Sequence, residues 1–219
     1  MKIEKFRDSL VFDASLSMYP TILTTHTKGD TSYPDVASTY FGIVISGEVS
    51  LVRQGAPKMT LGVGMYFSSV GSFTLSGSGE VVIIRRIGYR GLFTAGGPVE
   101  KSGRLVYIDN CTTSILIPPA RMGEPVLNLL VFPPNVEQTM HIHPTIRMGA
   151  VLSGQGKCIT PKSAPVDLAE KDVFYLPEAA AHCFYSGENG LAILAYHPDS
   201  EGGPTDEDHP MLNRTYTKF

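Results

Sequence analysis

The sequence has no tryptophan and only three cysteines among its 219 residues. Cys111, Cys158 and Cys183 are an odd set with no Cys-x-x-Cys spacing, which excludes a disulfide framework and a cysteine-based metal knuckle. Such sparse cysteine usage is typical of proteins in a reducing compartment, so we expect a cytoplasmic location.

The chain also lacks a strong excess of either charge. Lysine and arginine number 18 against 21 aspartate and glutamate residues, which gives a formal net charge of −3. No electrostatic argument therefore favours nucleic acid or an anionic membrane as a partner. We expect a small-molecule substrate or ligand instead.

Long hydrophobic runs are missing as well. Residues 1–8 are charged and lead into no apolar segment of the signal-peptide kind, and no window approaches the roughly 20 apolar residues of a membrane span. We therefore expect no membrane partner and no secretion.

No long segment keeps a 3.6-residue apolar period, so helices should be few and short. Glycine (22) and proline (16) instead separate short runs rich in Val, Ile, Leu, Tyr and Thr. This texture predicts an all-β sandwich or barrel. The expected strands are residues 40–46, 80–86, 104–109, 112–117, 126–132, 148–152, 172–176 and 191–196.

One short pattern occurs twice. Phe41–Glu48 and Met148–Gln155 share Gly-x-Val-x-Ser-Gly at an offset of 107 residues. Any hairpin that ends in Ser-Gly could match by chance, but both flanks have strand character, and a duplicated β-unit is the favoured interpretation. It predicts two domains, residues 1–95 and 96–219, joined within the glycine-rich stretch 88–103.

Three histidines of the second half suggest a metal site. His141 and His143 are two residues apart, which places both imidazoles on one face of a β-strand, and His182 follows Pro177. Three neutral imidazoles suit zinc or another first-row transition metal. Alternatively, hydrogen bonds satisfy these histidines at the surface or in the core. The first half contains only His26 and should hold no equivalent site.

These residues resemble the cupin superfamily, and specifically a bicupin, which has two tandem double-stranded β-helix (jelly-roll) barrels. The histidines and the proline match the family spacing, whereas the glutamate, the asparagine and two of three glycines do not. The first motif reads Asn135, His141, His143, Arg147 and Gly154, and the second reads Lys171, Pro177, Ala179, His182 and Ser186.

The resemblance implies a divalent transition metal on His141, His143 and His182 in the C-terminal barrel only. Cupins use iron, manganese, nickel, zinc or copper, and we favour Fe(II). The functions found on this fold range from dioxygenases to isomerases, lyases and binding proteins, and homodimers are expected from the same resemblance. Fold alone does not select among these functions.

Arg147 stands where the family places a metal-binding glutamate. A guanidinium has no lone pair to offer a metal. Three interpretations remain open: the metal is held by three histidines with Arg147 binding an anionic substrate, the positive charge has abolished metal binding, or Arg147 merely extends out of the barrel mouth.

Four further residues are candidates near this site. Glu137 lies four residues before His141 and shares its face if the strand is straight, so it is a candidate fourth ligand or general base, unless it caps the strand end in solvent. Phe184 shares parity with His182 and should wall the pocket, whereas Cys183 should face away. His197 ends an expected strand and is a candidate for substrate binding. The acidic segment 197–210 either folds over the barrel mouth, bringing Asp206 or His209 to the site, or is a solvated arm.

The favoured function is a dioxygenase-type metalloenzyme acting on an anionic chelating substrate, because a neutral three-histidine set leaves the metal charge for the substrate to balance. Isomerase or lyase chemistry with Glu137 or His197 as base uses the same residues. A non-enzymatic binding protein, in which the barrels serve as ligand pockets or dimerisation surfaces, is the alternative from another class.

Overall fold

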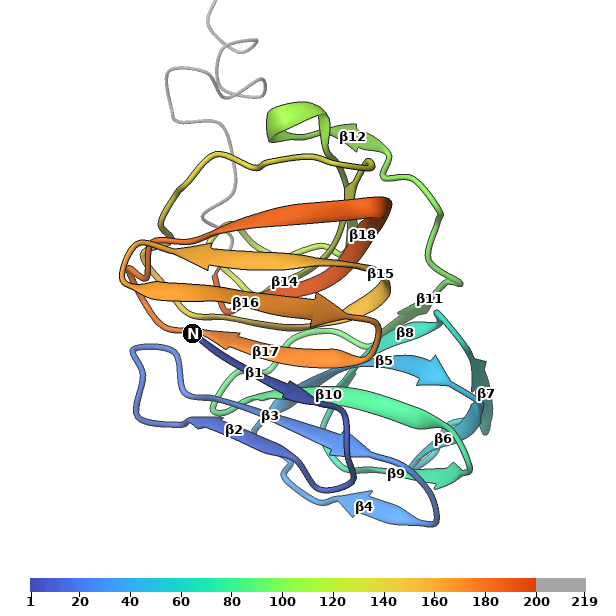
Figure 1. Ribbon diagram of the computed structural model, residues 1–219. Coiled ribbons are helices and arrows are strands. Elements are labelled where there is room, and N and C mark those ends of the chain that lie inside the picture. The colour runs from blue at the N-terminus through green and yellow to red at the C-terminus, as the bar shows by residue number, and fades with distance from the viewer. Residues whose placement is uncertain (200–219) are drawn as a thin grey trace, which may run out of the picture.

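A computed structural model describes residues 1–199 of the chain (Figure 1). Apart from one 3-10 turn at Ile108–Asn110, its regular elements are β-strands, which confirms the predicted all-β class. The strands are β1 (Lys2–Lys5), β2 (Val11–Ala14), β3 (Thr21–His26), β4 (Thr31–Tyr33), β5 (Thr39–Ser46), β6 (Glu48–Arg53), β7 (Met59–Gly62), β8 (Tyr66–Val70), β9 (Phe73–Gly77), β10 (Glu80–Arg86), β11 (Thr94–Gly96), β12 (Leu105–Val106), β13 (Thr112–Ile117), β14 (Val126–Phe132), β15 (Arg147–Thr160), β16 (Ser163–Ala169), β17 (Asp172–Leu176) and β18 (Cys183–His197).

The strands form three antiparallel sheets. The sheet that carries the histidine region has the order β1-β17-β15-β18-β14-β13-β12, with β16 added to β15. The other two have the orders β11-β8-β5-β10-β3-β2 and β4-β9-β6-β7. In Figure 1 these two occupy the lower half of the molecule, and the first sheet occupies the upper half.

The repeated sequence pattern marks the same local geometry in both halves. Gly42 of β5 pairs with Phe67 of β8, and Gly149 of β15 pairs with Phe174 of β17 at the same offset of 107. A Cβ at Gly42 would overlap the Phe67 ring, and one at Gly149 would lie 2.8 Å from Phe174 Cζ. Glycine is therefore needed in both strands so that an aromatic ring can lie against the backbone.

The glycine that ends each copy of the pattern has a second role. Gly47 has a φ of +66° and Gly154 a φ of +80°, a left-handed conformation that L side chains rarely adopt. The Ser-Gly match thus reflects a backbone requirement in both copies.

The first strand, β1, does not join the sheets formed by the rest of the first half. β1 pairs with β17, so residues 2–5 belong to the sheet built mainly from the second segment. The predicted boundary at residue 95 falls inside β11, which extends the sheet of the first segment by pairing with β8. The division into 1–95 and 96–219 stays a prediction, with the correction that residues 2–5 cross it.

The two halves share part of their core. One buried cluster combines Phe41 and Ile84 of the first half with Met148, Leu194 and Tyr196 of the second. The Phe41 and Tyr196 ring centroids are 5.1 Å apart. Burial of each such side chain stabilises the fold by roughly 1.5–3 kcal/mol, so this contact couples the halves energetically.

All three cysteines are buried and free, in agreement with the predicted absence of a disulfide framework. Within residues 1–199 we find no helix with the length and hydrophobicity needed to cross a bilayer.

Candidate metal centre

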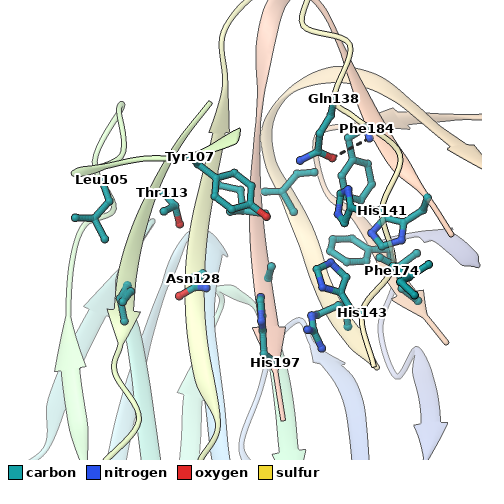
Figure 2. A pocket seen from close by; sticks show the side chains of 18 of the residues that line it. Leu105, Tyr107, Thr113, Asn128, Gln138, His141, His143, Phe174, Phe184 and His197 are labelled. Atoms are coloured by element: carbon teal, nitrogen blue, oxygen red, sulfur yellow. Dashed lines mark hydrogen bonds between the residues drawn. The ribbon is translucent and has the colours of Figure 1, made fainter. Parts of the chain in front are cut away.

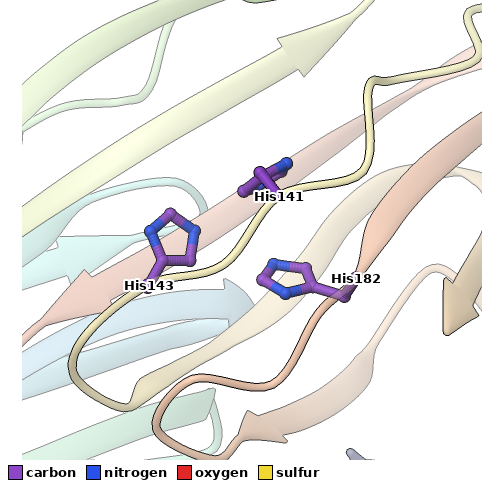
Figure 3. Close-up of side chains that lie close together, drawn as sticks. All are labelled: His141, His143 and His182. Atoms are coloured by element: carbon purple, nitrogen blue, oxygen red, sulfur yellow. The ribbon is translucent and has the colours of Figure 1, made fainter. Parts of the chain in front are cut away.

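The three predicted histidines converge. His141 and His143 lie in the segment between β14 and β15, and His182 lies just before β18 (Figure 3). His141 and His182 form an isolated β-bridge with two backbone hydrogen bonds of 3.0 Å. One ring nitrogen from each of the three residues lies within 4.8 Å of the others, so the three side chains form a group that could hold one cation.

Backbone carbonyl groups hold His141 and His182 in one tautomer. His141 Nδ1 lies 2.8 Å from the Thr139 carbonyl oxygen, and His182 Nδ1 lies 2.8 Å from the Ala180 carbonyl oxygen. A carbonyl only accepts, so each Nδ1 carries the proton and donates it. The lone pair is therefore on Nε2, as it is in histidines that bind a metal.

Burial keeps the rings of His143 and His182 neutral. Desolvation, followed by the positive charge of Arg147, lowers the pKa of His143 to about 3. Desolvation also lowers the pKa of His182 to about 4. Neutral imidazoles at physiological pH are the form that coordinates a metal, so the donor set fits a divalent transition metal.

The His-x-His spacing had suggested that His141 and His143 lie in a regular strand, but they do not. Only His141 makes a bridge, and the intervening Ile142 is 61% exposed. Both imidazoles still contribute to the cluster, and the exposed Ile142 between them also lines the cavity.

Glu137 was expected to share the face of His141 if the strand is straight, and the strand is not straight there. Glu137 pairs with Tyr185, and His141 pairs with His182. Between these two pairs one segment covers four residue steps, whereas the antiparallel segment opposite covers only three. This irregularity reverses the side-chain parity between the two positions. Glu137 is exposed and does not line the cavity, which leaves it as neither ligand nor base in this structure.

Gln138, and not Glu137, has its side chain on the cavity side of this segment. It is buried, lines the cavity, and accepts a hydrogen bond of 3.2 Å from the Phe184 backbone N–H through Oε1. Gln138 was not predicted, because no sequence pattern indicates the one-residue irregularity between the pairs Glu137–Tyr185 and His141–His182.

Arg147 is buried at the start of β15. It does not follow the interpretation in which its side chain extends out of the barrel mouth into solvent. Its Nη1 donates to the Thr145 hydroxyl at 2.6 Å, the Thr145 carbonyl at 3.1 Å and the Ile146 carbonyl at 2.8 Å. Asp199 Oδ1 lies 4.0 Å from the same nitrogen and accepts a hydrogen bond of 2.8 Å from the Thr145 hydroxyl. Burial lowers the pKa of Arg147 to about 10, so it remains a cation.

Phe184 and His197 both line the cavity, as the sequence had suggested for each. The Phe184 ring centroid lies 5.6 Å from that of His182, and the His197 centroid lies 6.1 Å from that of His143. Desolvation lowers the pKa of His197 well below its ordinary value. Cys183 is buried and does not line the cavity, in agreement with parity.

The histidines open into a cavity of about 630 Å³ (Figure 2). Its walls combine a polar end with aliphatic and aromatic side chains. Besides the three histidines, the lining residues are Leu105, Val106, Tyr107, Thr113, Ile115, Asn128, Leu130, Gln138, Ile142, Pro144, Arg147, Phe174, Leu176, Phe184, Ile193, Ala195 and His197. Sequence reasoning had named three of these seventeen, because the others carry no motif.

His26 is the single histidine of the first half. His26 is buried in β3, with Nδ1 3.1 Å from the Thr31 hydroxyl oxygen. In the described part of the chain, the cluster of His141, His143 and His182 is the one group of three or more such ligands that could hold a metal. Asp206 and His209, which were considered as additional site residues, lie outside the described residues.

Comparisons with known proteins agree with this geometry at the level of fold. No family model matches the sequence. No curated protein matches it significantly either.

Solved structures do match. A cupin 2 conserved barrel domain protein from Leptotrichia buccalis is 13% identical with a TM-score of 0.62, covering 89% of this chain and 95% of its own. A mutant of salicylate 1,2-dioxygenase from Pseudoaminobacter salicylatoxidans is 9% identical with a TM-score of 0.64, covering 86% of this chain and 75% of its own. Oxalate decarboxylase from Bacillus subtilis, described with Mn(II) centres, is 12% identical with a TM-score of 0.59, covering 91% of this chain and 77% of its own.

The chain therefore has the fold of cupin-domain proteins and carries a three-histidine cluster that suits a metal. At these identities the likeness concerns the fold, and the reaction must be argued from the site.

Proposed function

We propose that this protein is a metal-dependent small-molecule enzyme of the cupin type, most specifically a dioxygenase acting on an anionic chelating substrate. The observation that carries the proposal is the convergence of three imidazoles at one end of a cavity large enough for a small molecule. The presence of a dioxygenase and a decarboxylase among proteins of the same fold supports it.

In this proposal His141, His143 and His182 hold a divalent metal through one ring nitrogen each. Fe(II) is our favoured metal, with manganese, nickel, zinc and copper as alternatives. The bound metal supplies Lewis-acid chemistry and, if it is iron, a site for dioxygen activation. The protein contributes no carboxylate to the described ligand set, so an anionic substrate balances the charge.

Arg147 orients that substrate. Arg147 lines the cavity, and its positive charge contributes to the lowered pKa values of His143 and His182, which supports this role. The three hydrogen bonds from Nη1 to Thr145 and Ile146 hold the guanidinium in place. A fixed cation beside the metal selects substrates with a carboxylate or an enolate.

Isomerase or lyase chemistry is the second candidate, and His197 favours it. This histidine lines the same cavity, is kept neutral by burial and lies beside His143. A neutral imidazole there can accept a proton from a bound substrate, a role that the exposed Glu137 is not placed to fill.

We further propose that the two halves are tandem cupin barrels, of which the first is free of metal. Two facts support this: β5 and β15 have corresponding neighbours, and the first half has no histidine besides His26. A cytoplasmic location and a homodimer remain predictions.

Metal analysis of the purified protein tests the metal claim. We expect about one transition metal per chain, loss of that metal in His141→Ala, and retention in His197→Ala, which changes a cavity histidine outside the ligand cluster. Metal-free wild-type protein with unchanged stability would favour the non-enzymatic binding protein.

Oxygen consumption tests the reaction. We expect the metal-loaded protein to consume dioxygen with at least one member of a panel of diketones, catechols and hydroxy acids. Isomerised or cleaved product without oxygen uptake would favour the second candidate.

A further inference from the structure

The cavity extends well beyond the metal centre, along one face of the sheet. Its lining includes residues of β15, β18, β14, β13 and β12, which are consecutive neighbours in the strand order. Adjacent strands lie about 4.8 Å apart, so the four steps from β15 to β12 span about 19 Å. In Figure 2 His141 and His143 stand at one side of this space, and Leu105 and Thr113 stand at the other.

Two rows of paired residues form the floor of this space. In the first row Ala195 pairs with Asn128, which pairs with Ile115. In the second row Ile193 pairs with Leu130, Leu130 with Thr113, and Thr113 with Leu105. The floor is thus mainly apolar, and its smallest lining side chain is that of Ala195.

Asn128 is the polar group in the middle of this floor. Its Oδ1 is buried and has no hydrogen-bond partner among the residues that the structure describes. A buried carbonyl oxygen without a partner costs free energy, and a ligand that donates a hydrogen bond to it would recover that cost.

The far end of the cavity opens between exposed apolar side chains. Leu105 and Val106 of β12 are 51% and 90% exposed, and both line the cavity. An apolar ligand can therefore continue to the edge strand β12 without meeting a charged side chain of the lining.

We infer that the substrate is a carboxylate with an extended apolar body, which lies across β18, β14 and β13 and donates one hydrogen bond to Asn128 part-way along. The carboxylate pairs with Arg147 at the metal end. This inference rests on the proposed function for the anionic head, and adds the length, polarity and direction of the body. A compact acid confined to the histidine end is the competing occupant.

Calorimetric titration with saturated straight-chain acids, on the purified protein and after EDTA treatment, tests the length of the site. Each methylene that enters an apolar channel tightens binding by about threefold, so we expect decanoate to bind at least about tenfold more tightly than butanoate. Equal affinities, or tighter binding of the compact adamantane-1-carboxylate than of decanoate, would overturn the inference.

A blocking variant separates the channel from non-specific binding. Ala195→Leu places a larger side chain on the floor between the histidines and Asn128, and we expect it to abolish the advantage of decanoate over butanoate. The matched control is Ala192→Leu on the same strand, because Ala192 packs against the core and does not line the cavity. A chain-length advantage that survives in Ala195→Leu would place the ligand elsewhere.

Asn128 is tested with a series of hydroxydecanoates. At least one position of the hydroxyl should bind about threefold to tenfold more tightly than decanoate, and Asn128→Leu should reverse this preference. No gain at any position, or a gain that survives in the variant, would remove Asn128 from the inference.

These results are distinguishable from failure of the proposed function. Chain-length dependence in EDTA-treated protein needs no metal and no turnover. Equal binding of decanoate and decan-1-ol would instead argue against the anionic head, and leave the apolar channel in place.

Discussion

At the scale of single residues, the site depends on how neighbours fix the protonation and direction of each side chain. Two backbone carbonyls hold His141 and His182 in the Nδ1–H tautomer, and burial keeps His143 and His182 neutral. Arg147 is equally constrained, because its Nη1 donates three hydrogen bonds to its own strand segment.

The depressed histidine pKa values predict a pH dependence of stability. The unfolded chain binds a proton at an ordinary histidine pKa near 6.5, whereas folded His182 binds one only near pH 4. The unfolded state therefore binds more protons in this window, and the free energy of unfolding of EDTA-treated protein should fall by about 3 kcal/mol from His182 alone as pH drops from 6.5 to 4.

Urea denaturation at several pH values measures this dependence. His182→Gln removes the titrating group and should give a visibly flatter profile over the same window. A variant profile as steep as that of the wild type would show that His182 is not the buried neutral group described here.

Arg147 gives a second residue-scale prediction. Arg147→Met keeps much of the side-chain volume but leaves the Thr145 hydroxyl and Asp199 without their cationic partner. We expect the free energy of unfolding to fall by about 2 kcal/mol and carboxylate binding to weaken. Denaturation and calorimetric titration with decanoate measure the two effects, and unchanged carboxylate affinity would contradict the role given to Arg147.

At the scale of elements, a one-residue irregularity decides which side chains meet the metal centre. The segment 137–141 is one residue longer than its partner 182–185, which turns Gln138 inward and leaves Glu137 outside. Deletion of Met140 should restore uniform pairing, move the histidines out of register and abolish metal binding, whereas Met140→Ala should retain the metal. Metal analysis of both variants checks this, and a loaded deletion variant would contradict the register argument.

Glycine near the start of β15 is a second element-scale requirement. A Cβ at Gly149 would collide with the Leu194 carbonyl oxygen, whereas one at Gly62 in β7 would meet nothing within 4 Å. We expect Gly149→Ala to lower the free energy of unfolding by at least about 2 kcal/mol and Gly62→Ala to change it little. Chemical denaturation of both variants measures the difference, and equal effects would contradict the proposed close approach.

The sequence predicted the elements better than their irregularities. Strand composition and the three histidines were sufficient for the all-β class and the histidine cluster, because alternation and ligand type are visible in the sequence. The inward turn of Gln138 and the burial of Arg147 were not predictable, since they depend on a register shift and on hydrogen bonds to Thr145 that only the folded chain reveals.

At the scale of the whole molecule, the two halves are coupled by exchanged strands and a common core. β1 forms one edge of the sheet that carries the histidine region, and Phe41 packs on Tyr196. We expect a single cooperative unfolding transition, and Phe41→Ala should destabilise the whole chain by about 3–5 kcal/mol. Calorimetry that resolves two transitions, with only one of them shifted in Phe41→Ala, would contradict this coupling.

The central claim is that His141, His143 and His182 bind one transition metal at one end of the cavity. Anomalous diffraction from crystals of the metal-loaded protein tests it most directly. We predict a single strong peak about 2.0–2.2 Å from one nitrogen of each ring. A peak elsewhere, or three imidazoles without a peak in protein that contains metal, would contradict the account.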